Sequence, residues 1–251
     1  MKSDVTVILN GYKRKKQLDE QLSSLKNQTI KPDNIMLWYN YPGDDEFVNY
    51  DIMTEIPTAY SNVNLGVWAR FAYALNAETK YICIFDDDTI PGTKWLENCL
   101  TTMKTHRGLL GTVGLLYTIP QPPNPNSSYF EHYVRFGWPH NNTRVQEVDL
   151  VGHSWFFERD WLSVYWRELP DPKYKTCGED MHFSYMIQKY LGLKTYVPPH
   201  PADDKEMWGS LKGSEYGGVH SLWTEGPSNQ RQIMNQFFNE QRNKGWRFVN
   251  D

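Results

Sequence analysis

The sequence predicts an α/β fold with a mostly parallel β-sheet, because strand and helix signals alternate through its first half. Residues 5–9 (VTVIL) and 81–85 (YICIF) are short runs rich in β-branched and aromatic side chains, as buried strands are. Between them, residues 15–28 carry leucines three and four positions apart, which is the period of one helix face. Strands separated by such helices are joined by right-handed crossovers, so we expect parallel strands that are covered on both faces.

The other elements are less regular in the second half of the chain than in the first. A second strand is expected over 34–40 and a helix over 64–79. Further along, we expect helices over 94–106, 177–192 and 228–245, a strand over 109–119, and a strand, turn and short helix within 145–162. Loops are expected at 41–57, 120–128 and 198–226, and the length of the last one indicates a functional role.

Composition excludes several classes of function. A chain of 251 residues, 39% of them hydrophobic, can bury a substantial core, and we expect one domain over 1–251. The net charge of −4 gives no general attraction for nucleic acid. The longest nearly apolar run, 109–119, is too short for a transmembrane segment. Three cysteines without metal-type spacing, and an N-terminus without a signal-peptide pattern, favour a cytoplasmic protein.

Three consecutive aspartates directly follow the strand expected over 81–85. If extended backbone continues, Asp86 and Asp88 point to one side of the chain and Asp87 to the other. Two carboxylates on one side repel each other, and a divalent cation between them removes the repulsion. A solvated turn also explains acidic residues at a strand end. However, parallel sheets bind ligands at the carboxyl ends of their strands, so we expect a metal site here.

A second acidic pair opens the helix expected over 177–192. Glu179 and Asp180 lie in its first turn, where carboxylates stabilise the helix dipole by about 0.3–1 kcal/mol without any further function. Combined with an upstream D-x-D sequence, the same pair becomes a candidate for the catalytic carboxylates of a transferase, close to the reacting carbon and to the acceptor hydroxyl.

Cations and histidines occur where an anionic ligand would approach. Arg14 follows the first strand and belongs either to a solvated helical turn or to a clamp for a nucleotide. Arg231 lies in the first turn of the last helix, where a cation is unfavourable unless an anion such as a diphosphate approaches. His220, in a glycine-rich loop before that helix, is the first candidate for a histidine metal ligand and His200 the second, although lone histidines are more often loop or core residues.

In their order along the chain, several segments resemble the exostosin-like glycosyltransferases, glycosyltransferase family 64, which have the GT-A fold. The segments are ILNGYKRKKQLDEQL, IMLWYN, NLGVWARF, FDDDTIPG, LVGHSWFFERDWL, CGEDMHFSYMIQKYLG, EYGGVHSLW and QRQIMNQF. The resemblance implies a GT-A type, Rossmann-like three-layer α/β/α sandwich with a mostly parallel central sheet. It also implies a nucleotide-binding half over 1–90 and an acceptor-binding half, with the C-terminal loop and helix, over 91–251.

The resemblance further implies the retaining transfer of a sugar from a UDP-sugar donor to a glycan or glycoconjugate acceptor. The implied cofactor is Mn²⁺, with Mg²⁺ as the alternative. Donor-binding residues would be Gly11, Tyr12, Arg14, Asn40, Asn64, Arg70, Asp86, Asp87 and Arg231. Asp86 and Asp88 would hold the metal, and the residue pattern adds His220 as a third ligand. Asp180 would face the anomeric carbon, with Glu179 beside it.

Three alternatives stay open at this stage. Glu179 stands where the family has aspartate and is similar to the first acidic residue of inverting family 2 enzymes, in which case Asp180 is a base and the reaction inverts. A sugar nucleotidyltransferase also combines such a sheet with metal-binding carboxylates, but LNGYKRKK lacks its glycine-rich loop. A non-catalytic carbohydrate-binding relative is consistent with the 15% aromatic content, and Trp138, Trp155 and Trp208 are candidates for either sugar stacking or core packing.

Overall fold

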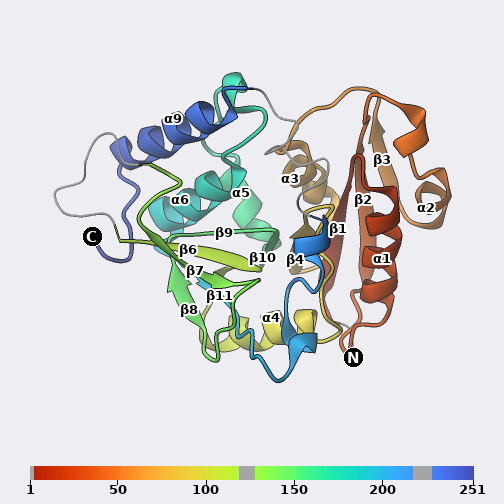
Figure 1. The fold of residues 1–251 in the computed structure, drawn as a ribbon, viewed down its shortest axis with the longest axis horizontal. Helices are drawn as coiled ribbons and strands as arrows, with labels where there is room; N and C mark the ends of the chain where they lie inside the picture. The colour runs from red at the N-terminus through yellow and green to blue at the C-terminus, as the bar shows by residue number, and fades with distance from the viewer. Residues whose placement is uncertain (1–2, 119–127, 217–227) are drawn as a thin grey trace.

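The computed structural model describes residues 3–118, 128–216 and 228–251. At its centre is an eight-stranded sheet of order β3-β2-β1-β4-β10-β5-β11-β8, beside a three-stranded sheet of order β7-β6-β9 (Figure 1). The strands are β1 (Val5–Gly11), β2 (Asn34–Asn40), β3 (Thr58–Ser61), β4 (Tyr81–Phe85), β5 (Gly108–Leu110), β6 (Val113–Tyr117), β7 (Tyr133–Gly137), β8 (Gln146–Val148), β9 (Leu150–Gly152), β10 (Ser154–Glu158) and β11 (Lys194–Val197).

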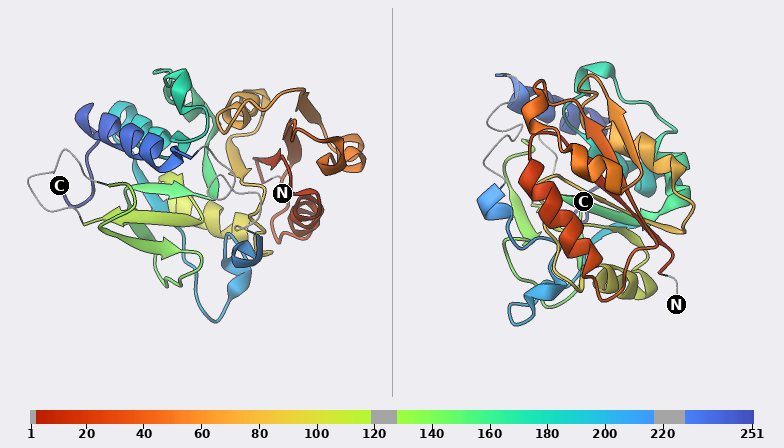
Figure 2. Two further views of the ribbon diagram at one scale, coloured as in Figure 1. Left: turned by 45° about the horizontal axis from the view of Figure 1, so that its top comes forward. Right: turned by 90° about the vertical axis from the view of Figure 1, so that its right-hand side faces the viewer.

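Helices cover the sheet on both sides. They are α1 (Lys15–Lys26), α2 (Tyr50–Glu55), α3 (Ala69–Tyr73), α4 (Trp95–Thr105), α5 (Leu162–Tyr165), α6 (Glu179–Leu191), α7 (Gly213–Tyr216) and α9 (Gln230–Asn243). In Figure 1, α4 lies below the strands of the second half, whereas α6 and α9 lie above them. Helix α1 lies over the strands of the first half (Figure 2, right). In the part of the chain that the structure describes, no helix is both long and apolar enough to cross a membrane.

The expected α/β fold with a mostly parallel sheet is confirmed. Strands β3, β2, β1 and β4 run parallel to one another, as do β5 and β11. Strand β10 is antiparallel to both of its neighbours, β4 and β5. Because β4 belongs to the first half of the chain and β10 to the second, this pairing joins both halves in one sheet.

The core follows from the apolar strand runs. Val5, Val7, Ile8 and Leu9 of β1 are fully buried, because β1 lies between two strands and contacts α1 and α3. The strands that the site depends on are thus held by the removal of apolar surface from water, about 25 cal/mol for each Å².

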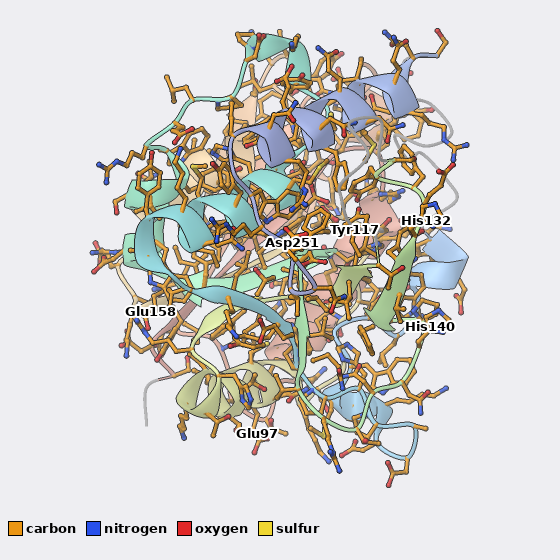
Figure 3. All side chains as sticks on the ribbon, turned by 90° about the vertical axis from the view of Figure 1, so that its left-hand side faces the viewer. Glu97, Tyr117, His132, His140, Glu158 and Asp251 are labelled. Atoms are coloured by element: carbon orange, nitrogen blue, oxygen red, sulfur yellow. The ribbon has the colours of Figure 1, made fainter. Side chains whose placement is uncertain are left out.

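The C-terminal segment is packed against the second half of the fold. The rings of Tyr117 and Phe248 are stacked with centroids 4.9 Å apart, and the Asn250 side chain donates to the Tyr117 carbonyl at 3.0 Å. Figure 3 shows Tyr117 beside the chain end at Asp251. The end of strand β6, which borders the cleft described below, is therefore packed against the C-terminal segment.

The helix expected over 64–79 is wrong in its extent. Residues 64–68 have no regular secondary structure, and only α3 and a short 3₁₀ turn, Ala74–Asn76, are helical. Gly66 has a φ of +79°, which favours glycine, and a Cβ there would lie 2.1 Å from the carbonyl oxygen of Lys175. The chain is therefore pressed against the segment that precedes α6, and Asn64 lies in a loop that faces the carboxyl ends of the strands.

The strand expected over 109–119 is also wrong, because the chain changes sheets within it. Strand β5 belongs to the large sheet and β6 to the small one. Gly111 lies between them, and a Cβ there would lie 2.4 Å from the Cβ of Val151. The sequence pattern also missed β3, α2, β7 and β11, which are short or lie in segments expected to be loops.

His200, the second candidate for a histidine metal ligand, is a core residue. It is fully buried, with ring centroids 5.4 Å from Trp95 and 5.8 Å from Trp208. Its Nε2 accepts from the Gly209 amide at 3.2 Å, so Nδ1 carries the proton and donates to the Pro198 carbonyl at 2.8 Å. Both nitrogens are used within the fold. Burial lowers the pKa of His200 to about 4.

We expect the free energy of unfolding to fall as the pH is lowered from 6.5 to 5, because protonation at Nε2 removes the bond from Gly209. The ordinary histidine pKa of 6.5 applies to the unfolded chain, which therefore binds the proton first. The stability from neutral His200 is present above pH 6.5 and is lost as the pH falls toward 4, by about 2 kcal/mol at pH 5. Urea unfolding at both pH values measures this contribution as the difference between wild type and His200→Gln, because burial also lowers the pKa of His182 to about 4 and that residue titrates in both proteins. A loss of stability of the same size in the variant would contradict the assignment to His200.

Candidate functional site

A cleft of two compartments begins at the carboxyl ends of β1, β2 and β4 and continues along the small sheet of β6, β7 and β9. The first compartment has a volume of about 270 Å³, and the second, which adjoins it, about 570 Å³. Asp86, Asp88, Thr176 and Glu179 border both compartments. The acidic residues therefore stand at the junction, where molecules bound in the two compartments would meet.

The first compartment is lined mainly by polar and charged side chains. The residues expected from the sequence to bind the donor that line it are Tyr12, Arg14, Asn40, Asn64, Arg70, Asp86 and Asp87. They end or follow three neighbouring parallel strands, except Asn64, which lies in the loop before α3, and Arg70, which lies in α3 itself, so the sheet order brings most of them together. Such a lining suits a polar, charged ligand.

Asn40 takes part by shaping the wall of this compartment. Its side-chain amide donates to the Gly66 carbonyl at 3.1 Å, and its side-chain oxygen accepts from the Leu65 amide at 3.1 Å. Asn64 holds the same segment, because its side-chain oxygen accepts a hydrogen bond from the Gly66 amide at 2.7 Å. The tight turn at Gly66 is thus fixed by two asparagines.

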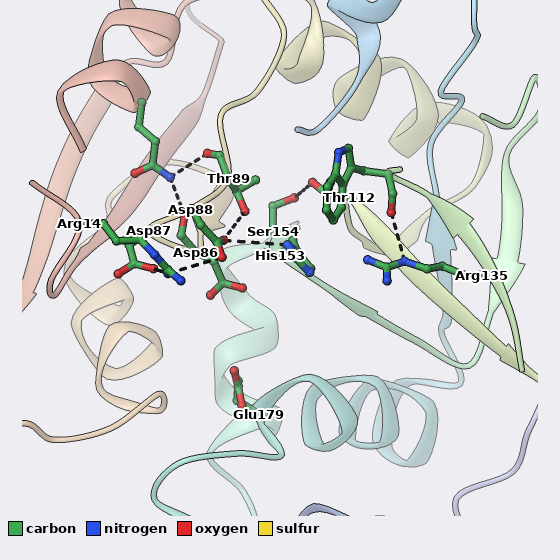
Figure 4. Close-up of polar contacts among 12 residues, drawn as sticks. Arg14, Asp86, Asp87, Asp88, Thr89, Thr112, Arg135, His153, Ser154 and Glu179 are labelled. Atoms are coloured by element: carbon green, nitrogen blue, oxygen red, sulfur yellow. Dashed lines mark hydrogen bonds and ion pairs between the residues drawn. The ribbon is translucent and has the colours of Figure 1, made fainter. Parts of the chain in front are cut away.

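The aspartate turn after β4 is held by side chains from the first half of the chain. Arg14 forms an ion pair with Asp87 and lies 3.4 Å from an oxygen of Asp88. Gln21, on α1, donates to the backbone carbonyls of Asp86 and Thr89, both of which are labelled in Figure 4. Burial raises the pKa of Asp87 to about 6, and the Arg14 guanidinium opposes that rise.

Arg70 connects the aspartate turn to the start of α6. Its Nη1 pairs with Asp86 and its Nη2 with Glu179 at 2.9 Å, and its side chain is 3% exposed. The guanidinium carbon also lies 4.7 Å from the ring centroid of Trp155. A buried cation with two carboxylate partners fixes their separation, because moving either one leaves a buried charge uncompensated.

Glu179 and Asp180 begin α6 at the junction between the compartments. Gly178, which precedes them, has a φ of +91°, and a Cβ there would lie 2.6 Å from the ring of Phe237. Burial raises the pKa of both carboxyl groups, while Arg70 lowers that of Glu179. Asp180 accepts hydrogen bonds from the Tyr129 hydroxyl at 3.2 Å and from the Met181 amide at 2.7 Å. Among the described lining residues, Glu179 borders both compartments and Asp180 the second.

A group suited to a divalent cation is formed by Asp86, Asp88 and His153. One potential ligand atom from each lies within 4.8 Å of the other two. His153 Nδ1 is 4.0 Å from Asp88 Oδ1 and is buried without a hydrogen-bond partner among the described residues. Two carboxylates and an imidazole fit Mn²⁺ or Mg²⁺ by donor chemistry, with the imidazole favouring Mn²⁺. The buried Nδ1 of His153 beside the carboxylates of Asp86 and Asp88 therefore fits a site for a divalent cation.

His153 was missed by sequence reasoning because nothing in its local pattern marks it. The antiparallel pairing of Ser154 with Phe85 places it opposite Asp86, whose amide donates to the His153 carbonyl at 3.0 Å. Its φ of +65° is unusual for a residue with a side chain. This backbone strain at a cleft is the signal that the structure adds.

Three residues expected at the site are not among the described residues that line it. Gly11 packs at the end of β1 against Tyr39, whose ring a Cβ would approach to 2.7 Å, and it is not among the described lining residues. Arg231 is exposed in the first turn of α9, with its guanidinium carbon 4.7 Å from the ring centroid of Phe130. His220 lies outside the described residues.

Of the three tryptophans that were candidates for sugar stacking, two line the cleft and one does not. Trp138 and Trp155 line the second compartment. Trp208 packs against His200 and donates its ring N–H to the Pro201 carbonyl at 2.6 Å, so its role is structural.

Comparison with solved structures identifies the fold. No family model matches the chain, and neither does any curated protein. S. aureus TarS matches with a TM-score of 0.52 and 16% identity over 79% of this chain and 37% of that chain. TarS 1–349 in complex with UDP has a TM-score of 0.52 and 16% identity, covering 80% and 59% of the two chains. TarS 1–349 in complex with UDP-GlcNAc has a TM-score of 0.50 and 15% identity, covering 95% and 72%.

This likeness shows the fold alone. The α/β arrangement with its large, mostly parallel sheet is similar to glycosyltransferase folds, as expected from the sequence. The chain spans little more than a third of the TarS chain that it matches.

Proposed function

We propose that the chain is a metal-dependent glycosyltransferase that moves a sugar from a UDP-sugar donor to a glycan or glycoconjugate acceptor. The observation that carries this proposal is the cleft, in which a polar compartment and an aromatic one meet at one acidic group. A transfer reaction needs two sites that share a reacting centre. The complexes of TarS with UDP and UDP-GlcNAc support a UDP-sugar as the donor.

The donor would occupy the first compartment. The residues proposed to contact it are Tyr12, Arg14, Asn64, Arg70, Asp86 and Asp87, with Asn40 shaping the wall. Gly11 would act indirectly, through the path of the chain. For Arg231, which lies exposed beside Phe130, binding to the diphosphate stays a prediction.

The metal would be held by Asp86, Asp88 and His153, and the role proposed for His220 falls outside the described residues. A bound Mn²⁺ or Mg²⁺ supplies positive charge that stabilises the diphosphate as it leaves. Arg14 and Arg70 each neutralise part of the acidic group now, so the turn can form without the ion.

Asp180 is the proposed base, and this favours an inverting reaction over the retaining one implied by the resemblance. Asp180 borders the second compartment, where the acceptor hydroxyl would lie, and Tyr129 orients its carboxylate. A base on the acceptor side removes the proton as the hydroxyl attacks the face opposite the leaving group. Glu179, paired with Arg70, would orient the donor. The configuration of the product, read by proton NMR, distinguishes the two outcomes.

The decisive experiment measures UDP binding and UDP release with and without Mn²⁺. We expect UDP to bind at least tenfold more tightly with Mn²⁺, and chelation to stop UDP release from the UDP-sugar that serves as donor. Equal rates with chelator would overturn metal dependence. Release of pyrophosphate from UTP and a sugar phosphate would indicate the nucleotidyltransferase instead, and glycan binding without UDP binding would indicate a non-catalytic relative.

A further inference from the structure

One wall of the second compartment carries a cation that has no carboxylate partner among residues 3–118, 128–216 and 228–251. Arg135, on β7, lines this compartment. Its Nε donates to the Trp138 carbonyl at 3.2 Å, and its guanidinium carbon lies 5.4 Å from the Trp138 ring centroid. These contacts hold the guanidinium in place and leave its two terminal NH₂ groups for a ligand.

Arg135 differs in this respect from the arginines of the first compartment. Arg14 and Arg70 each pair with carboxylates of the site. Arg135 is half-buried, and burial lowers its pKa, because no nearby carboxylate in the described chain compensates its charge. A partly desolvated guanidinium without an anion costs folding free energy. Such a residue is best explained by an anion that arrives with a ligand.

Aromatic side chains connect this cation to the acidic group. The ring centroids of Trp138 and His153 are 5.4 Å apart, and His153 Nδ1 is 4.0 Å from Asp88. Figure 4 shows Arg135 on the far side of His153 from the aspartates. Flat faces beside a cation fit a sugar ring that carries a negative charge, since the ring stacks on the aromatic face while the charge binds the guanidinium.

We propose that the second compartment takes an acceptor sugar that carries an oxyanion, and that Arg135 binds this oxyanion while Trp138 contacts the sugar ring. The proposal rests on the proposed function and narrows its acceptor to anionic glycans. Carboxylate and phosphate share the chemistry that a guanidinium recognises, which is a pair of oxygens for two parallel N–H donors. The position of Arg135 also keeps the anion away from the acidic group, which would otherwise repel it.

The test compares three probes: methyl β-D-glucoside, which is neutral, methyl β-D-glucuronide, which carries a carboxylate, and glucose 6-phosphate. Saturation-transfer NMR at low salt measures their binding to wild type. We expect at least one charged probe to bind about tenfold or more tightly than the neutral one, as a charge-assisted bidentate contact gives. A preference limited to one charged probe identifies the source of the oxyanion.

Variants of Arg135 test whether this residue causes the preference for charged probes. Arg135→Gln is expected to remove the preference for charged probes. Arg135→Lys is expected to keep part of this preference, because lysine retains the positive charge but lacks the two parallel N–H donors of a guanidinium. Arg144→Gln, an exposed site with the same change in net charge, is the matched control and should keep the full preference. If charged probes bind wild type no better than the neutral probe, or if Arg135→Gln keeps the preference, the proposal is wrong. UDP binding, measured by calorimetry on the same samples, tests the proposed function separately.

Discussion

Replacing Asp88 with asparagine is expected to abolish sugar transfer, with a fall in kcat of about 1000-fold or more. Asp88 borders both compartments and lies in the group with Asp86 and His153. Asparagine keeps the size of the side chain and removes its charge, so the cation loses a carboxylate ligand. Without that ion, the charge that develops on the leaving diphosphate lies beside Asp86 and Asp87, whose own charges Arg14 and Arg70 neutralise only in part.

The measurement is UDP release together with UDP affinity at several Mn²⁺ concentrations. In Asp88→Asn we expect the enhancement of UDP binding by Mn²⁺ to be lost, while circular dichroism shows a folded protein. Asp160→Asn, which changes an exposed carboxylate, is the control and should behave as wild type. Unchanged turnover in Asp88→Asn would remove the metal role from this residue.

The sequence predicted the sheet and the acidic centre because both depend on local patterns. The apolar runs of β1, β2 and β4 determine buried strands, and the crossovers between them make those strands parallel. Residues at the ends of such strands then meet at one edge without further information. This is why Arg14, Asn40 and Asp86 were expected together and line one compartment.

The remaining site residues could not be predicted because they depend on pairings between distant segments. His153 faces the aspartates only because β10 enters the sheet antiparallel to β4, and no local pattern fixes that direction. Arg135 reaches the second compartment from β7, a strand of the small sheet that the sequence did not reveal. Arg70 was expected to bind nucleotide, and its pairing with Glu179 arises from the contact between the Gly66 turn and the segment before α6.

The two acidic residues of α6 were expected as a pair, and the structure gives them different surroundings. Glu179 shares Arg70 with Asp86 and borders both compartments. Asp180 accepts a hydrogen bond from Tyr129 and borders the second compartment. Adjacent residues on a helix point about 100° apart, so the first turn of α6 can serve two compartments at once.

Replacing Asp180 with asparagine is therefore expected to lower kcat by about 100-fold to 10,000-fold and to leave UDP affinity nearly unchanged. Asparagine fits the same space but cannot take the proton of the acceptor hydroxyl. Because burial raises the pKa of Asp180, the wild-type rate should increase with pH above the usual range of an aspartate, and this limb should be absent in the variant.

The contrast with Glu179→Gln separates a base from a group that orients the donor. Glu179→Gln weakens the pair with Arg70 and should therefore reduce UDP affinity as well as kcat. Tyr129→Phe removes one hydrogen bond to Asp180 and is expected to lower kcat by only about tenfold or less. A weakened UDP affinity in Asp180→Asn, with kcat intact, would assign Asp180 to the donor side and remove it as the base. Calorimetry with UDP and initial rates over a range of pH decide between these results, since only a base on the acceptor side affects the chemical step without affecting the donor.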